Sequence, residues 1–301
     1  ANINDLRWEA LNPDGRLYAT ALSDNIVRVW DTATGQLLHT LSGHTAQITN
    51  IAFNRNGTQI VTGSNDNTAK IWDVGSSQLL RTLSGQRGVV LSAAFSPDGT
   101  RIATTNGDFT ATVWDAATGQ ELRTLFGHTN DVTAVQFSPD GKRLATVSWD
   151  RKGIVWEVET GQQLFTLSGH TGAVFNLAFS PDGTRLATSS TDGTAKLWDV
   201  SSGGELPTLP INAFYSSAFN PEQTHIAVVN PDWTAGIWDL TTGKSLLTLS
   251  DPLGIHTVAF SRDGTRLVTT APRNETMIVW DAATGDQQLR LTDLKVVDAT
   301  F

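Results

Sequence analysis

Short runs of alternating apolar and polar residues follow one another along the whole chain, separated by turn residues. Between residues 131 and 168 four such runs occur: DVTAVQF (131–137), KRLATVS (142–148), RKGIVWE (151–157) and QQLFTLS (162–168). Period-two alternation with β-branched residues favours strands. SPDG between the first two runs suits a type I turn, since proline presets φ and glycine takes the left-handed position. The pattern predicts four short strands, here called a, b, c and d.

A tryptophan followed by an acidic residue ends strand c throughout the chain. The pairs are Trp30-Asp31, Trp72-Asp73, Trp114-Asp115, Trp156-Glu157, Trp198-Asp199, Trp238-Asp239 and Trp280-Asp281, with spacings of 42, 42, 42, 42, 40 and 42. Self-similarity at such a period indicates a repeat architecture. The approximate repeats, numbered one to seven, are 2–42, 43–84, 85–126, 127–168, 169–209, 210–250 and 251–292, followed by one extra strand at 293–301.

These residues resemble the WD40 repeat family over all seven repeats. The resemblance implies an all-β fold, a seven-bladed β-propeller of four-stranded antiparallel blades, formed by residues 1–301 as a single domain. The segments SPDGTRLATSSTDGTAKLWD (180–199) and DAATGQELRTLFGH (115–128) are similar in sequence to WD40 repeat arrays in large bacterial and cyanobacterial signalling proteins. That likeness implies a bacterial signalling context.

Three repeats contain a histidine, a threonine, an aspartate and the tryptophan at matching positions. The sets are His44, Thr62, Asp66 and Trp72; His128, Thr146, Asp150 and Trp156; and His170, Thr188, Asp192 and Trp198. Thr, His and Asp together invite a nucleophilic-triad interpretation. A triad should occur once, however, and this set recurs beside the same tryptophan. The family resemblance implies instead a buried hydrogen-bond tetrad that ties loops to strand c.

Other repeats depart from this tetrad. Gln86 stands at the histidine position of repeat three, where we expect its amide to supply one hydrogen bond. Repeat six has Val228 in place of the threonine and no histidine, and repeat seven has Asp251 near the histidine position. We therefore expect repeats six, seven and one to be less tightly tied.

Loop lengths single out one face of each blade. The a–b and c–d connections keep their length, whereas strand d to the next strand a shortens after Leu209, Leu249 and Leu291, and the b–c loop of repeat seven gains a residue within 271–275. Consecutive strands alternate direction, so the d–a and b–c loops share a face. Variable loops on a rigid scaffold are typical of a binding surface.

Large side chains gather on the same connections. Trp149 and Trp233 flank the turn aspartate of two b–c loops, and Arg151 follows such an aspartate. Near the start of strand a, successive repeats have Phe175, Tyr215, His256 and Arg7. Aromatic residues and arginine are enriched at interface hot spots. Two interpretations stay open: these seven residues bind a partner, or they plug the channel mouth or pack against the shortened loops.

Composition narrows the function classes. With no cysteine there are no disulfides or thiol nucleophiles, and the net charge of −9 without a basic run argues against nucleic acid. No apolar run is long enough for a membrane span. GKS at 243–245 lacks the earlier glycine of a phosphate-binding loop, and no histidine spacing indicates a metal site. We expect no cofactor, no metal and no catalytic residue.

The leading interpretation is a non-catalytic interaction scaffold whose d–a/b–c face binds a protein or peptide. One alternative is a ligand-sensing regulatory domain of a larger signalling protein, and another is a propeller enzyme. We expect a cytoplasmic, monomeric domain with no membrane contact, and leave open that it is part of a longer chain. Residues 5–11 and 293–301 both suit the inner strand of blade one, and the short NPDG connection favours the N-terminal segment.

Overall fold

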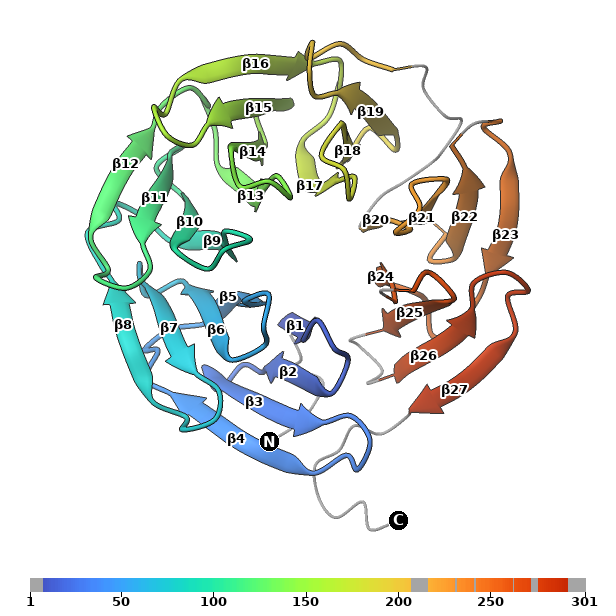
Figure 1. Cartoon of the computed structure of the whole chain (residues 1–301), viewed down its shortest axis with the longest axis horizontal. Helices are drawn as coiled ribbons and strands as arrows, with labels where there is room; N and C mark the ends of the chain where they lie inside the picture. The colour runs from blue at the N-terminus through green and yellow to red at the C-terminus, as the bar shows by residue number, and fades with distance from the viewer. Residues whose placement is uncertain are drawn as a thin grey trace. The chain divides into compact units, whose positions relative to one another are not determined.

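The computed structural model describes residues 8–206, 216–230, 232–240, 242–261, 263–271 and 276–291. Every regular element within them is a strand, and the 27 strands form seven antiparallel sheets in which neighbours along the chain pair with each other. Figure 1 shows these sheets, one for each repeat. The fold class expected from the sequence is therefore confirmed: an all-β, seven-bladed propeller.

The blades follow the repeats in order. Blade 1 contains β1 (Trp8–Leu11), β2 (Leu17–Ala21), β3 (Ile26–Asp31) and β4 (Leu37–Ser42). Blade 2 contains β5 (Ile48–Phe53), β6 (Gln59–Ser64), β7 (Ala69–Asp73) and β8 (Leu79–Leu83). Blade 3 contains β9 (Val90–Phe95), β10 (Arg101–Asn106), β11 (Ala111–Asp115) and β12 (Glu121–Leu125). Blade 4 contains β13 (Val132–Phe137), β14 (Arg143–Ser148), β15 (Lys152–Glu157) and β16 (Gln163–Ser168).

The remaining blades are shorter in their described parts. Blade 5 contains β17 (Val174–Phe179), β18 (Arg185–Ser190) and β19 (Ala195–Asp199). Blade 6 contains β20 (Ser217–Phe219), β21 (His225–Val229), β22 (Ala235–Asp239) and β23 (Ser245–Leu249). Blade 7 contains β24 (Thr257–Phe260), β25 (Arg266–Ala271), β26 (Thr276–Asp281) and β27 (Gln287–Leu291). In blade 5 the bridge Trp198–Glu205 marks the start of the fourth strand position, and 207–215 lie outside the described residues.

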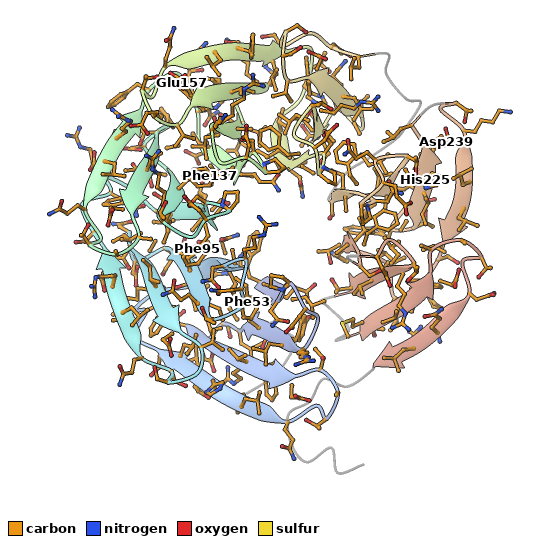
Figure 2. All side chains as sticks on the ribbon, viewed as in Figure 1. Phe53, Phe95, Phe137, Glu157, His225 and Asp239 are labelled. Carbon is orange, nitrogen blue, oxygen red and sulfur yellow. The ribbon has the colours of Figure 1, made fainter. Side chains whose placement is uncertain are left out.

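The described residues divide into two compact units. Unit 1 comprises 8–146 and 156–162, and unit 2 comprises 147–155 together with the described part of 163–291. In unit 1, Phe53, Phe95 and Phe137 end the first strand of three successive blades, and Figure 2 labels them at these corresponding places. Residues at equivalent positions of the sequence repeat therefore lie at equivalent positions of successive blades.

The turn chemistry explains why the same short motifs recur. In the a–b turn of blade 3, Gly99 has φ 73° and its N–H donates to the Ser96 carbonyl at 2.9 Å. Asp98 Oδ1 accepts from Ser96 Oγ at 2.6 Å and from the Thr100 N–H at 3.0 Å. The hydrogen bond from Ser96 is the main reason that the pKa of Asp98 lies below its usual range. Serine, aspartate and glycine are thus each required by this turn.

The acid after each tryptophan has a similar local role at the c–d turn. Asp115 Oδ1 accepts from both the N–H and the Oγ of Thr118, each at 2.7 Å. The Thr118 side chain is the main cause of the lowered pKa of Asp115. The Trp-Asp ending therefore combines a buried core residue with the residue that begins the next turn.

The cores lie between neighbouring blades of each unit. In unit 1, Val29 and Leu41 of blade 1 pack in one buried cluster with Ile48, Ile60 and Trp72 of blade 2. In unit 2 an equivalent cluster joins residues of blades 6 and 7. A blade cannot bury its apolar faces alone, so stacking against the next blade supplies most of the stabilisation.

The inner strand of blade 1 is β1, which pairs with β2 from Trp8↔Ala21 to Leu11↔Tyr18. The N-terminal segment thus has the place that its short turn favours. The competing segment, 293–301, lies outside the described residues.

Candidate functional site

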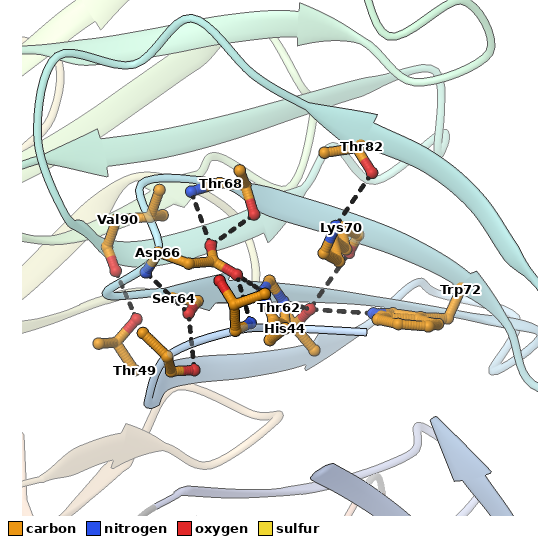
Figure 3. Close-up of polar contacts among 12 residues, drawn as sticks. His44, Thr49, Thr62, Ser64, Asp66, Thr68, Lys70, Trp72, Thr82 and Val90 are labelled. Carbon is orange, nitrogen blue, oxygen red and sulfur yellow. Dashed lines mark hydrogen bonds and ion pairs between the residues drawn. The ribbon is translucent and has the colours of Figure 1, made fainter. Parts of the chain in front are cut away.

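The tetrad of blade 2 forms a continuous hydrogen-bond chain, shown in Figure 3. Trp72 Nε1 donates to Thr62 Oγ1 at 2.9 Å, Thr62 Oγ1 lies 2.7 Å from His44 Nε2, and His44 Nδ1 lies 2.7 Å from Asp66 Oδ2. The Thr45 N–H also donates to this carboxylate oxygen, at 3.1 Å. The chain links the d–a loop that precedes blade 2 to its b–c loop and to strand c.

Burial sets the protonation of this chain. Desolvation lowers the pKa of His44, which outweighs the opposing effect of Asp66. Burial also opposes ionisation of Asp66, but hydrogen bonds from Thr68 and His44 hold the pKa of its carboxyl below the usual range. At neutral pH the imidazole is therefore neutral, with its Nδ1–H donating to the carboxylate and Nε2 accepting from the Thr62 hydroxyl. Each donor then has one acceptor.

Blade 5 repeats this geometry. His170 lies 3.0 Å from Asp192 and 2.8 Å from Thr188, to which Trp198 donates at 2.8 Å. In blade 4, Trp156 Nε1 donates to Thr146 at 2.9 Å and His128 Nε2 lies 2.9 Å from the same hydroxyl.

The accessibility of the threonines argues against a nucleophilic triad. Thr62 and Thr146 have no exposed surface and Thr188 only 1%. A nucleophile must reach its substrate, whereas a buried and fully paired chain rigidifies its surroundings. The geometry therefore favours the structural interpretation of the tetrads in blades 2 and 5 and of the His128–Thr146–Trp156 contacts in blade 4.

The incomplete tetrads differ in what remains unpaired. Trp30, Trp114 and Trp280 still donate to a threonine, at 3.0, 2.9 and 2.8 Å. In blade 6, where Val228 replaces the threonine, the buried Trp238 Nε1 has no partner. Gln86 in blade 3 has none for either of its buried amide atoms. The expectation that this amide supplies a hydrogen bond is wrong, because neither amide atom meets a donor or acceptor in the interior of blade 3.

The b–c turns show a feature that sequence reasoning missed. The residue after each turn aspartate has a positive φ: Asn25 (62°), Asn67 (63°), Phe109 (71°), Arg151 (71°), Gly193 (80°) and Trp233 (64°). Asn and Gly tolerate this left-handed conformation, but bulky residues rarely adopt it. The signal was available in the alignment of the repeats, because three of the six positions hold Asn or Gly. Bulky side chains at the others indicate a use that outweighs the strain.

Trp233 and His256 are brought together in unit 2. Their rings stack with centroids 4.4 Å apart at an interplanar angle of 30°. The Ile255 N–H donates to the Trp233 carbonyl at 2.7 Å, which ties the d–a loop before blade 7 to the b–c loop of blade 6. Gly254, with φ 82°, lets this loop approach, since a Cβ there would lie 3.1 Å from Trp233 Cβ. Both rings remain partly exposed.

The other predicted binding residues are placed as follows. Trp149 is half exposed, at 50%, and Arg151 is exposed on the same b–c loop of blade 4. Phe175 is partly buried on β17. Arg7 and Tyr215 lie outside the described residues. Of the seven residues, the geometry described here joins Trp233 with His256.

A cavity of about 590 Å³ lies in unit 1, at the end of blades 3 and 4 that is opposite to their d–a and b–c loops. Charged side chains of both signs line it, and Arg101 forms an ion pair with Glu159 at 2.7 Å. Pockets for small organic ligands are mostly apolar with a few polar groups. This groove lacks that character.

The described residues contain no group of three or more His, Asp or Glu side chains arranged to hold a metal ion. They also contain no helix long and apolar enough to cross a membrane.

Comparison with known proteins supports the repeat interpretation. Residues 89–297 match the family model described as "IFT122 first beta-propeller", and residues 1–31 and 35–73 match "WD domain, G-beta repeat". Over 54 residues the chain is 46% identical to "Dynein assembly factor with WD repeat domains 1" of Mus musculus, and 43% identical to the proteins of that name in Danio rerio and Homo sapiens.

That match covers 18% of this chain and 13% of each of those relatives. The relatives are eukaryotic, so they do not support the bacterial signalling type that the sequence of the repeats suggested. The repeats, the blades and the model match over residues 89–297 agree. The chain therefore belongs to the WD40-repeat β-propeller proteins, in the family described by the first β-propeller of IFT122.

Proposed function

We propose that this chain is a non-catalytic scaffold that binds a protein or peptide through its d–a and b–c loops, with Trp233 and His256 at the centre of the contact. WD40 propellers generally bind proteins, which supports the general role. The observation that carries the specific proposal is the stacked pair itself: a bulky aromatic residue held in a left-handed turn, partly exposed, and fixed by a neighbouring loop.

A fixed aromatic ring suits an interface because little side-chain entropy remains to be lost on binding. The Ile255–Trp233 backbone bond and the imidazole hold the indole before any partner arrives. Tryptophan is also the residue type most enriched at hot spots. Trp149 and Arg151, exposed on a b–c loop, extend the proposed contact residues within unit 2.

The alternatives fit these observations less well. A propeller enzyme needs an accessible nucleophile or acid–base pair, and the Thr-His-Asp sets are buried and repeated. Most pockets for small ligands are predominantly apolar, and the charged groove of unit 1 is not, so it gives no support to a small-ligand sensor. The relatives' short match does not span a whole relative, so we propose no dynein-assembly role. A cytoplasmic location and the absence of nucleic-acid partners stay predictions.

The test is quantitative capture of partners from a lysate of the source organism, with Trp233→Asn and His256→Ala compared with the unaltered chain. Asparagine keeps the turn, as at Asn25 and Asn67, and removes the ring. We expect Trp233→Asn to weaken binding of a specific partner about 30-fold, as for a hot spot. The matched control is Leu246→Ser, which removes a 48% exposed apolar side chain of the same unit.

Retained partner binding in Trp233→Asn and His256→Ala, together with weakened binding in Leu246→Ser, would contradict the proposed contact. Circular dichroism and urea unfolding of each variant separate a loss of binding from a loss of fold.

A further inference from the structure

The residue two positions before the strand-c tryptophan is a lysine in blades 2 and 5, whereas blade 3 has a threonine there. In blade 2 it is Lys70, whose Nζ donates to Thr82 Oγ1 at 3.1 Å. In blade 5 it is Lys196, whose Nζ donates to Glu205 Oε1 at 2.5 Å. In blade 3 the residue is the short and buried Thr112. This blade therefore has no ammonium of its own at that place.

Blade 3 nevertheless contains both groups that accept from these lysines, a threonine hydroxyl and a glutamate carboxylate. Thr112 pairs with Thr124 across β11 and β12, in the same register as Lys70 with Thr82. Trp114 pairs with Glu121, in the same register as Trp198 with Glu205. The Thr124 hydroxyl donates to Glu121 Oε1 at 2.6 Å, so the two acceptor side chains are in contact.

A cavity of about 120 Å³ opens beside these residues. Gln86, Asn106, Thr112, Glu121 and Thr124 contribute to its lining, together with Gly85, Arg87, Asp108, Thr110, Trp114 and Phe126. The volume exceeds the roughly 30 Å³ that one water takes in the liquid. It is therefore large enough for a small organic group.

Unpaired acceptors mark the interior of the cavity lining. Asn106 is 1% exposed, its Nδ2 donates to Thr110 and Thr112 at 3.1 Å each, and its Oδ1 has no partner. Gln86 Oε1 is a second buried acceptor without a partner, and Gln86 Nε2 is a buried donor without one. Buried acceptors without partners are costly, so Asn106 Oδ1 and Gln86 Oε1 favour an occupant that donates hydrogen bonds, whereas Gln86 Nε2 still needs an acceptor.

We propose that this cavity binds a primary alkylammonium group, which takes the place that the Lys70 and Lys196 ammonium groups have in blades 2 and 5. An ammonium has three donors and no acceptor. Glu121, Thr124, Asn106 Oδ1 and Gln86 Oε1 supply the acceptors. The carboxylates of Glu121 and Asp108 outweigh the one cation of the lining, Arg87. Phe126, which is 72% exposed, offers an apolar surface for the methylene stem.

The group can come from a lysine side chain of a partner or from a free amine, and both present the same chemistry. The direct test is titration of the folded chain with n-butylammonium chloride, followed by NMR of the Gln86 and Asn106 side-chain amides. We expect saturable shifts of these signals, and none with n-butanol. Titration with Nα-acetyl-lysine-N-methylamide assigns the source: saturable shifts support a lysine side chain, and shifts with n-butylammonium alone support a free amine.

Glu121→Gln, at an exposed position, removes the charge and should weaken n-butylammonium about tenfold, the effect of one charge-assisted hydrogen bond. The matched control is Glu159→Gln, an exposed acid elsewhere in unit 1, which should leave binding unchanged. Absence of saturable shifts in the folded unaltered chain, or equal affinity in Glu121→Gln, would overturn the proposal.

A second pair of variants fills the cavity from within. Thr112→Lys and Thr112→Met add stems of similar size, and both should abolish n-butylammonium binding. Only the lysine supplies the ammonium, so its melting temperature should exceed that of Thr112→Met, and Glu121→Gln should remove the difference. Equal melting temperatures of the two variants, with both folded, would show that the cavity has no preference for an ammonium.

Discussion

Blades 2 and 6 have the same strand order and c–d turn chemistry but differ in the hydrogen bonds around the central tryptophan. In blade 2 the indole N–H begins a chain of three bonds that ends at Asp66. In blade 6 the chain is absent, and the buried Trp238 Nε1 has no partner. The comparison teaches that stacking of apolar faces forms the blade, whereas the tetrad adds stability to its loops.

The loops of the two blades differ accordingly. In blade 2 the d–a and b–c loops are tied through His44 and Asp66, and the left-handed turn position holds Asn67. Around blade 6 the neighbouring loops are joined instead by the Trp233–His256 stack and the Ile255–Trp233 bond. Loops that lack the buried tie thus carry the aromatic pair that we propose for partner binding.

The largest effect on stability is expected for Thr62→Val in blade 2, which removes the hydrogen bonds at the centre of the tetrad. It leaves the Trp72 indole and the His44 ring nitrogen unpaired in the interior, and we expect a loss of about 3 kcal/mol in the free energy of unfolding. Urea denaturation measures it. The matched control is Thr104→Val in blade 3, where the threonine accepts from Trp114 but Gln86 makes no bond, so the loss should be about half. Equal losses would show that the histidine bond contributes nothing.

The opposite substitution, valine to threonine in blade 6, tests the same difference between the two blades. Val228→Thr in blade 6 supplies an acceptor for Trp238, and we expect a gain of about 1 kcal/mol by urea denaturation. Val229→Thr, on the neighbouring buried position, buries a hydroxyl away from that register and should destabilise. If Val228→Thr also destabilises, the indole and the new hydroxyl do not meet.

The tetrads should make stability depend on pH. Burial lowers the pKa of His44 and His170 from 6.5, so the unfolded chain binds more protons than the folded chain below that pH. Their contribution is complete above about pH 6.5 and is lost as the pH falls toward the folded pKa values. The lowered pKa values of Asp66 and Asp192 add a second loss below pH 3.8.

We therefore expect the melting temperature to fall between pH 7 and pH 5, and to fall less in the His44→Gln, His170→Gln double variant. Melting curves at constant ionic strength measure it. The same pH dependence in the unaltered chain and in the double variant would mean that these imidazoles do not remain neutral in the folded protein.

The smallest expected effect concerns the left-handed turns. Arg151→Asn and Phe109→Asn replace bulky residues at φ 71° by the residue found at Asn25 and Asn67. We expect each to gain about 0.5 kcal/mol in the free energy of unfolding, since asparagine tolerates this conformation. The reverse change, Asn67→Phe, should cost a similar amount. A loss of stability in Arg151→Asn would indicate that the arginine makes stabilising contacts.

The sequence determined the repeat, the four-strand blade and its turns, because these depend on period-two alternation and on local side-chain–backbone bonds such as those of Asp98 and Asp115. It also predicted the three tetrads, since a fixed spacing of His, Thr, Asp and Trp recurs with the repeat. Trp233 and His256 were each singled out as large residues on variable loops. Their partnership was not, because nothing local relates a b–c turn of one repeat to the strand-a entrance of the next.

Only the tertiary structure decided what happens where the pattern fails. The unpaired amide of Gln86, the unpaired indole of Trp238 and the cavity beside Thr112 all follow from packing between segments distant in sequence. Asn and Gly at the matching positions of other repeats already indicate a left-handed turn, but only the folded turns show that Phe109, Arg151 and Trp233 adopt it. A repeat specifies its regular members through local chemistry, whereas the consequence of each departure depends on the volume and the hydrogen-bond partners that surrounding strands leave around it.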